Sequence, residues 1–255
     1  MQKKTMLFFC IIQQKCVTLH PMKQYTDLFI DFDDTLYDTH GNAVIALQEL
    51  YRELRLQRFF PRPEVFYNAY WEANIDLWTR YAHGEIDRDY LIVERFRRPL
   101  SLGEGLQPTA DDCRRVSDRF LDLCSTKPGL VRDARALVDY LLLSGYRLHL
   151  CSNGFHEVQN RKLRACGLDG RFDTVILSED AGANKPSQQF FDYALRVSKA
   201  QKETTLMIGD NYSTDIEGAL RAGLDTAYFN RFPDYPAPGP CTYEVTGLAQ
   251  LMNVL

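Results

Sequence analysis

Short apolar runs that end in polar residues recur along this chain, with helical patterns between them. The predicted strands are 25–32, 146–151, 172–177, 205–208 and 226–229. Because a run such as Leu28 to Ile30 shows no alternation of apolar and polar positions, it predicts a strand buried on both faces. The predicted helices between the later strands are 130–145, 156–166, 188–198 and 215–222. This alternation predicts an α/β fold with a doubly wound parallel sheet. We expect one more short strand and a final helix within 243–255.

The segment from 37 to 127 has a different pattern. Apolar residues recur there at steps of three and four, which is typical of amphipathic helices. The four helical stretches lie within 43–54, 65–77, 90–96 and 110–123. Thr109 precedes the last stretch and is a candidate N-cap. We therefore predict a core domain at 22–36 and 128–255 and a helical-bundle domain inserted at 37–127.

Residues 1–21 precede the first predicted strand and contain the apolar run 6–12 behind two lysines. A basic start and a short apolar run imitate a signal peptide, but no small-residue cleavage site follows. The run is also far shorter than the about 20 apolar residues that a membrane span needs. We expect 1–21 to be a disordered leader or a translational extension outside the fold.

Composition narrows the classes of partner. A formal charge of −4 argues against a surface for non-specific binding of a nucleic-acid polymer. The seven cysteines are scattered and form no CxxC pair, so the sequence predicts neither a zinc site nor a disulfide framework. A reducing, cytoplasmic location fits this cysteine pattern best. We expect a small-molecule substrate and no membrane partner, with monomer and homodimer both left open.

Two carboxylates lie at the carboxyl end of the first predicted strand. Asp31 and Asp33 are two positions apart, so strand geometry places both on one face. The carboxyl end of such a strand is where open α/β sheets bind ligands. At about 4 Å and an effective dielectric constant of roughly 20, two such charges repel by about 4 kcal/mol. A cation, a bound proton or both must offset this repulsion, unless the pair is a solvated turn.

Further polar groups follow in a regular order. Ser152 and Asn153 end the second predicted strand, and Asp210 ends the fourth. Lys185 precedes a proline, so we expect it in the loop ahead of the next helix. Asp215 lies five residues beyond Asp210 and has two interpretations, an acid of the site or the N-cap of a helix beginning near 216.

This ordered set resembles the four motifs of the haloacid dehalogenase-like (HAD) hydrolase superfamily: DxDxT, a strand-terminal Ser or Thr, a lysine, and an acidic GD…D segment. The resemblance spans residues 27–231. Within the superfamily, the stretches 152–155, 184–186 and 209–216 look most like those of the YjjG-type pyrimidine 5′-nucleotidases. The resemblance implies a Rossmann-like core with a helical cap between the first two motifs, where the insert at 37–127 falls.

The resemblance also implies Mg²⁺-dependent hydrolysis of a small phosphomonoester through an aspartyl-phosphate. Asp31 would be the nucleophile. Asp33 would be the general acid and then the general base, a role that needs a raised pKa, for which crowding by other carboxylates is one cause. Asp31, the backbone carbonyl of Asp33 and Asp210 would hold Mg²⁺.

The remaining residues of the motifs receive their roles in the same way. Ser152 and the backbone amide of Asn153 would bind the phosphoryl oxygens. Lys185 would neutralise charge in the transition state. Asp215 would hold metal-bound water or orient Lys185.

The substrate implied is a nucleoside 5′-monophosphate, with two alternative functions left open. A phosphosugar phosphatase or mutase would keep the same acids. A 2-haloacid dehalogenase would not need Asp33, because halide leaves without protonation. A phosphoacceptor signalling module is not expected, because it would lack the helical insert and the Asp-x-Asp pair. Aromatic residues at helical spacing in the insert favour packing of the cap over stacking on a base; they are Tyr67, Tyr70, Trp71, Trp78 and Tyr81.

Overall fold

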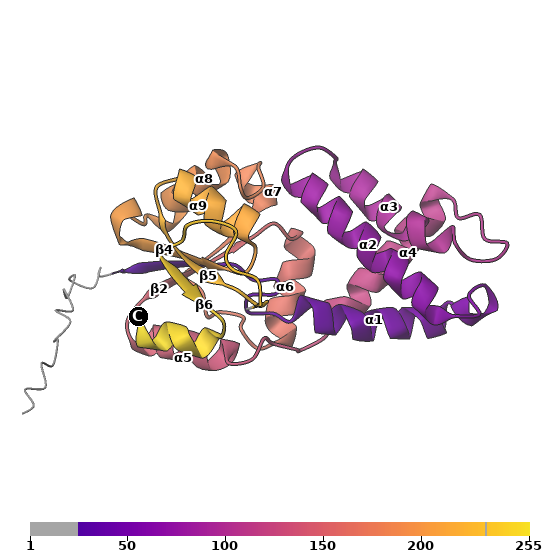
Figure 1. The fold of residues 1–255 in the computed structure, drawn as a ribbon, viewed down its shortest axis with the longest axis horizontal. Helices are drawn as coiled ribbons and strands as arrows, with labels where there is room; N and C mark the ends of the chain where they lie inside the picture. Colours follow the sequence, from indigo (N-terminus) through magenta and orange to yellow (C-terminus); the bar gives the residue numbers. More distant parts are fainter. Residues whose placement is uncertain (1–24, 233) are drawn as a thin grey trace, which may run out of the picture.

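The computed structural model describes residues 25–232 and 234–255, which fold into a sheet domain and a helical cap beside it (Figure 1). The predicted leader at 1–21 lies outside the described residues, as does the predicted start of the core at residue 22.

The sheet has six parallel strands within the described ranges. They are β1 (Asp27–Ile30), β2 (Arg147–Ser152), β3 (Thr174–Leu177), β4 (Thr205–Gly209), β5 (Asp225–Phe229) and β6 (Tyr243–Val245). Their order is β3-β2-β1-β4-β5-β6, and every neighbouring pair is parallel. The predicted doubly wound sheet is confirmed. Strand order reverses at β1, so the crevice at the carboxyl end of β1 is the expected ligand position.

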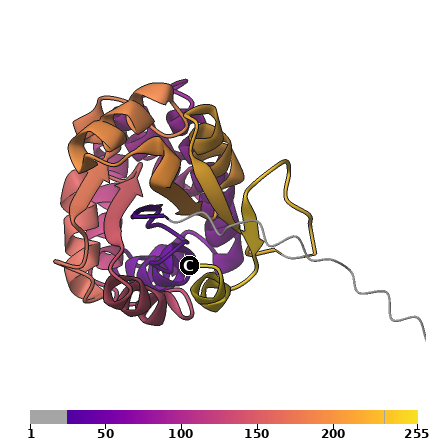
Figure 2. The same cartoon turned by 90° about the vertical axis from the view of Figure 1, so that its left-hand side faces the viewer.

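Helices cover both faces of this sheet, as Figure 2 shows from the end opposite the cap. One face carries α5 (Ala134–Leu143), α6 (His156–Ala165) and the final 3₁₀ helix η4 (Leu248–Asn253). The other carries α8 (Gln188–Ser198) and the one-turn helix α9 (Gly218–Arg221). Leu28 and Ile30 pack toward the first face, and Phe29 packs toward the second. This two-sided burial explains why β1 shows no alternation.

Short elements complete the core. They are α7 (Ser178–Ala181), the 3₁₀ helix η2 (Lys202–Thr204) and the π-helix η3 (Tyr212–Glu217). The predicted helix at 215–222 thus begins earlier, at residue 212, and changes from π to α at Gly218. None of the described helices is long and apolar enough to span a membrane.

Four helices form the cap, as the periodicity predicts. They are α1 (Thr39–Glu53), α2 (Pro63–Ala82), α3 (Arg88–Leu100) and α4 (Ala110–Cys124), with a 3₁₀ turn η1 (Leu56–Arg58) after α1. Thr109 is the N-cap of α4: its hydroxyl accepts from the Asp112 amide, and the Asp112 carboxylate accepts from the Thr109 amide. The domain boundaries at 37 and 127 stay predictions.

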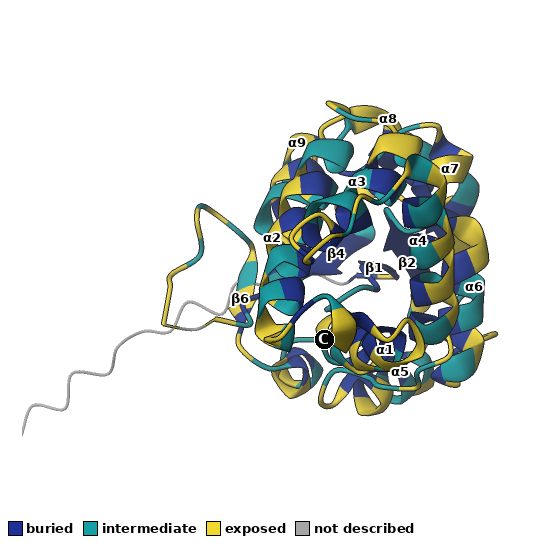
Figure 3. Cartoon of the chain, turned by 90° about the vertical axis from the view of Figure 1, so that its right-hand side faces the viewer, coloured by how far each residue is buried: buried dark blue, intermediate teal, exposed yellow. Residues whose placement is uncertain are grey.

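The cap has a hydrophobic core of its own, in which Tyr70, Phe96 and Phe120 pack together. Figure 3 views the molecule from the cap side and shows exposed outer faces on its helices. A second apolar cluster joins Leu77 and Leu91 of the cap to Phe155 and Val158 of the core. The cap therefore packs against the segment that follows β2, over the carboxyl edge of the sheet.

Candidate active site

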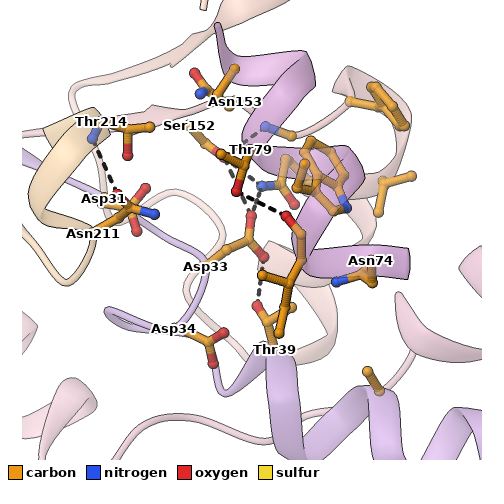
Figure 4. A pocket seen from close by; sticks show the side chains of 18 of the residues that line it. Asp31, Asp33, Asp34, Thr39, Asn74, Thr79, Ser152, Asn153, Asn211 and Thr214 are labelled. Carbon is orange, nitrogen blue, oxygen red and sulfur yellow. Dashed lines mark hydrogen bonds between the residues drawn. The ribbon is translucent and has the colours of Figure 1, made fainter. Parts of the chain in front are cut away.

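The carboxyl ends of β1, β2 and β4 meet at one cavity of about 400 Å³ (Figure 4). This volume lies within the range typical of small-molecule sites. All seven residues that the sequence singles out line it: Asp31, Asp33, Ser152, Asn153, Lys185, Asp210 and Asp215. Parallel pairing explains the convergence, because β1 is hydrogen-bonded to both β2 and β4.

Lys185 is a buried cation that contacts two of the carboxylates lining this cavity. Its side chain is only 2% exposed, and its ammonium donates to Asp31 Oδ1 at 2.6 Å and to Asp215 Oδ1 at 2.7 Å. A third bond goes to the carbonyl oxygen of Cys151 at 2.8 Å. All three N–H groups of the ammonium are thus satisfied.

Asn153 fixes the loop that carries Lys185. Its side-chain oxygen accepts from the Lys185 amide at 2.8 Å, and its side-chain nitrogen donates to the Lys185 carbonyl at 2.9 Å. Lys185 lies ahead of α8, as predicted, because Ser187 caps that helix. The Asn153 side chain therefore links the end of β2 to the loop that holds the cation.

Asp215 is an acid of the site and not a helix cap. The N-cap of η3 is Asn211, whose side chain accepts from the Thr214 amide at 3.1 Å. Asp215 is 1% exposed, and its second oxygen accepts from the Asn211 amide at 3.1 Å. A Cβ at Gly209 would lie 2.3 Å from Asp215 Oδ2, so the close approach of this carboxylate requires glycine there. The helix-cap interpretation of Asp215 is therefore wrong.

Three carboxylates cluster where a cation could bind. Oxygens of Asp31, Asp210 and Asp215 lie within 4.8 Å of one another. Lys185 supplies one positive charge against these three groups, which leaves an excess of two negative charges when all are ionised. An all-oxygen set with that excess fits a hard divalent cation such as Mg²⁺.

Burial changes the titration of these acids. Burial raises the pKa of Asp31 to about 7; Lys185 opposes the rise and Asp215 adds to it. Burial, followed by the charges of Asp31 and Asp215, raises the pKa of Asp210 well above its ordinary value. Both carboxyl groups thus bind protons more tightly than in water.

Thr35, the last residue of the DxDxT motif, holds Asp210 in place. Its hydroxyl donates to Asp210 Oδ1 at 3.2 Å and accepts from the Asp210 amide at 3.0 Å. The motif thus joins the end of β1 to the end of β4.

Asp33 has a different environment from the one predicted. Its carboxylate faces α6, where it forms an ion pair with Lys162 at 2.5 Å, and it accepts from Thr39 Oγ1 at 2.7 Å. Burial alone would raise the pKa of Asp33, but the charge and hydrogen bonds of Lys162 lower it overall. The expectation of a pKa raised by neighbouring carboxylates is wrong for this conformation, because the group points to an ammonium and not into the acidic cluster.

Gln159 and Lys162 on α6 are site residues that the sequence reasoning missed. Gln159 donates to Asp33 Oδ2 and also to Ser152 Oγ, the latter at 2.6 Å. A Cβ at Gly154 would lie 2.2 Å from Gln159 Nε2, so glycine is needed for this approach. A signal was present in the sequence: both residues are polar yet occupy the buried face of an amphipathic helix, at a spacing of three.

The cap supplies the other, mostly apolar, wall of the cavity. Tyr70, Trp71 and Trp78 of α2 line it, together with Phe120 of α4. The same stripe also packs, as predicted: Tyr70 lies in the cap core, and Trp78 packs against Phe155 with 5.6 Å between ring centroids. Packing and lining are therefore served by the same aromatic residues.

Comparisons with known proteins agree with this geometry. Residues 28–223 match the family model of haloacid dehalogenase-like hydrolases. The chain is 31% identical to the HAD-hydrolase YfnB of Bacillus subtilis, over 92% of this chain and 97% of that protein. A crystal structure of YfnB bound to magnesium superposes with a TM-score of 0.80 at 29% identity, covering 91% of this chain and 99% of that one.

Two pyrimidine 5′-nucleotidases are similar over nearly the whole length. PynA of Streptococcus pneumoniae is 28% identical, over 91% of this chain and 95% of that protein. YjjG of Escherichia coli is 28% identical, over 89% of this chain and 96% of that protein.

Proposed function

The chain belongs to the haloacid dehalogenase-like hydrolase family and is a phosphoric monoester hydrolase, and we propose that it uses Mg²⁺ and acts on nucleoside 5′-monophosphates. The observation that supports this most is the buried Lys185, which bonds to Asp31 and Asp215 beside Asp210 in one cavity. This arrangement suits a reaction that is limited by charge neutralisation and in-line positioning.

In the first step, an oxygen of Asp31 attacks phosphorus, and the bond from phosphorus to the ester oxygen breaks. Lys185 is within hydrogen-bonding distance of Asp31 and offsets the negative charge that accumulates there. The Ser152 hydroxyl and the backbone amide of Asn153 bind phosphoryl oxygens. The product of this step is an aspartyl-phosphate on Asp31 and an alcohol.

Asp33 transfers the protons. It gives a proton to the leaving alkoxide and then takes one from the water that hydrolyses the aspartyl-phosphate. In this structure Lys162 favours the ionised form of Asp33. A phosphate dianion that enters beside Asp33 brings negative charge and so favours the protonated form that the first step requires.

Asp31, the backbone carbonyl of Asp33 and Asp210 would hold the magnesium ion. When bound, the ion supplies positive charge to the phosphoryl group and fixes its orientation. Two features support this assignment: the excess negative charge of the carboxylate cluster and the magnesium bound in the similar structure of YfnB. Asp215 then has the role of orienting Lys185, in line with its 2.7 Å contact.

The nucleotide substrate is supported by the two similar pyrimidine 5′-nucleotidases and by the aromatic wall of the cavity. Trp71 and Trp78 line the cavity, and stacking of a base on an aromatic side chain contributes about 1–3 kcal/mol.

A panel of substrates tests the proposal. Phosphate release is measured in Mg²⁺ buffer from dUMP, dTMP, UMP and several sugar phosphates, and halide release from 2-chloropropionate. We expect the highest kcat/KM for a pyrimidine nucleotide and no halide release. Turnover of sugar phosphates alone would overturn the nucleotide assignment, and halide release without phosphate release would overturn the phosphatase assignment.

A further inference from the structure

Arg95 is a buried arginine without an anionic partner in the wall of the active-site cavity. It lies on α3, is 2% exposed, and lines the same cavity as Asp31 and Lys185. Its Nη2 donates to Ser117 Oγ at 2.8 Å, but its Nε is buried without a hydrogen-bond partner. Among residues 25–232 and 234–255, no carboxylate forms an ion pair with it. The guanidinium therefore lies in the cavity wall with one buried donor, Nε, unsatisfied and no carboxylate paired with it in the described chain.

The neighbouring arginines of α3, unlike Arg95, form ion pairs with carboxylates. Arg97 pairs with Glu94 at 3.1 Å, and Arg98 pairs with Asp76 at 2.6 Å, so both have an anionic partner although the Nε of Arg97 is also buried without a hydrogen bond. Burying a charged group without a partner destabilises a fold, so a position that served packing alone would favour an apolar side chain. Burial lowers the pKa of Arg95, yet an arginine keeps its proton in a protein at neutral pH. The unpaired charge suggests that its partner is a ligand.

The surroundings of Arg95 restrict what that ligand is. The guanidinium carbon lies 5.4 Å from the ring centre of Phe120, and Tyr70 and Trp71 line the cavity nearby. No acidic side chain from α2, α3 or α4 lines the cavity. The cap therefore offers aromatic walls, the polar side chains of Asn74 and Thr79, and a guanidinium whose polar atoms are all hydrogen-bond donors. A planar ring that carries carbonyl oxygens at its edge matches the aromatic walls and the guanidinium.

We propose that Arg95 binds the ring carbonyl oxygens of a pyrimidine base and thereby selects pyrimidine nucleotides. This proposal rests on the proposed function, because the phosphate of the same molecule must lie at Asp31 and Lys185. Arg95 acts on specificity through the part of the substrate farthest from the reacting bond. Uracil and thymine present two carbonyl acceptors to a donor of this kind.

The test compares two substrates that differ only in the base, dUMP and 2-deoxyribose 5-phosphate. The ratio of their kcat/KM values is measured for the wild type, Arg95→Met, Arg95→Lys and the control Arg97→Met. The binding free energy of a hydrogen bond to a charged group corresponds to a change of about 10- to 150-fold in kcat/KM. Arg95→Met should therefore lower the preference for dUMP by that factor. Arg95→Lys should keep part of the preference, and Arg97→Met should keep all of it.

Melting temperature separates recognition from a structural role. Because Arg95→Met removes a buried unpaired charge, we expect its melting temperature to equal or exceed that of the wild type. A residue that only supports the fold would lower the melting temperature and reduce both kcat/KM values equally, which would overturn the proposal.

Further outcomes distinguish the two proposals. If the wild type hydrolyses neither compound, or does not prefer dUMP, the nucleotidase assignment fails and the role of Arg95 with it. If the wild type prefers dUMP and Arg95→Met keeps that preference, only the Arg95 assignment fails. A selective loss on glucose 1,6-bisphosphate relative to glucose 6-phosphate would show binding of a second anion and would also overturn base recognition.

Discussion

Replacing Asp31 by Asn should abolish activity and at the same time stabilise the metal-free protein. Asp31 is 7% exposed and shares its surroundings with two further carboxylates, Asp210 and Asp215. Asparagine has nearly the same shape but cannot carry the negative charge or form the phosphorylated intermediate. Activity should fall by several orders of magnitude while the fold persists.

The size of the stability change follows from the pKa of Asp31, which burial raises from 3.8 to about 7. Each pKa unit corresponds to about 1.4 kcal/mol, so the ionised group destabilises the fold by about 4 kcal/mol. Because the folded pKa is raised, stability is full below pH 3.8 and is lost as the pH rises toward 7. The opposing attraction of Lys185 is already contained in this net shift. Because asparagine does not ionise, the stability of Asp31→Asn should not fall over this pH range.

Urea denaturation in EDTA, followed by far-ultraviolet circular dichroism at pH 4 and pH 8, measures this effect. At pH 8 the variant should exceed the wild type by about 4 kcal/mol, or roughly 10 °C in melting temperature for a chain of this size. At pH 4 the two should nearly coincide. Asp169→Asn, which changes an exposed aspartate outside the cavity, is the control and should show neither effect.

Two results would contradict this reasoning. If Asp31→Asn were less stable than the wild type at pH 8, the contact between Lys185 and Asp31 would outweigh the burial of the charge. If the difference in stability between the variant and the wild type were independent of pH, the carboxylate of Asp31 would not be its source. Retained turnover would reject Asp31 as the nucleophile.

Three further predictions concern the cation, Asp33 and the amino terminus. EDTA should abolish activity and Mg²⁺ should restore it. Mg²⁺ at 100 times its dissociation constant should stabilise the fold by about 2.7 kcal/mol, and a denaturation midpoint that does not change with Mg²⁺ concentration would contradict the site. Lys162→Met should lower kcat about 10- to 100-fold and cost about 1–3 kcal/mol at pH 7, because it leaves the partly buried Asp33 unpaired. Since Lys162 lowers the pKa of Asp33, this stability gap should close below pH 3.8, and a gap that persists in acid would exclude the ion pair as its cause. Deleting residues 1–21 should leave melting temperature and kcat unchanged, and a substantial loss of either would place the segment within the working fold.

Local patterns in the sequence were enough to predict the elements and the edge of the sheet at which the site lies. Apolar runs without alternation and apolar steps of three and four depend only on the chain's own periodicity, and they predicted the parallel strands and the cap helices. The N-cap at Thr109 is equally local, because both of its hydrogen bonds lie within three residues. The end of a strand is also a property of the sequence, so Asp31, Ser152 and Asp210 could be expected at one edge.

The neighbours that those residues contact depend on how distant segments pack together. Lys185 and Asp31 are 154 positions apart, and Lys162 and Asp33 are 129 apart, so no local pattern could have predicted either pair. A pKa depends on burial and on every nearby charge, which explains why the expectation for Asp33 had the wrong direction. The unpaired charge of Arg95 was hidden for the same reason, because a helix pattern shows which positions are buried but not whether a partner lies across from them.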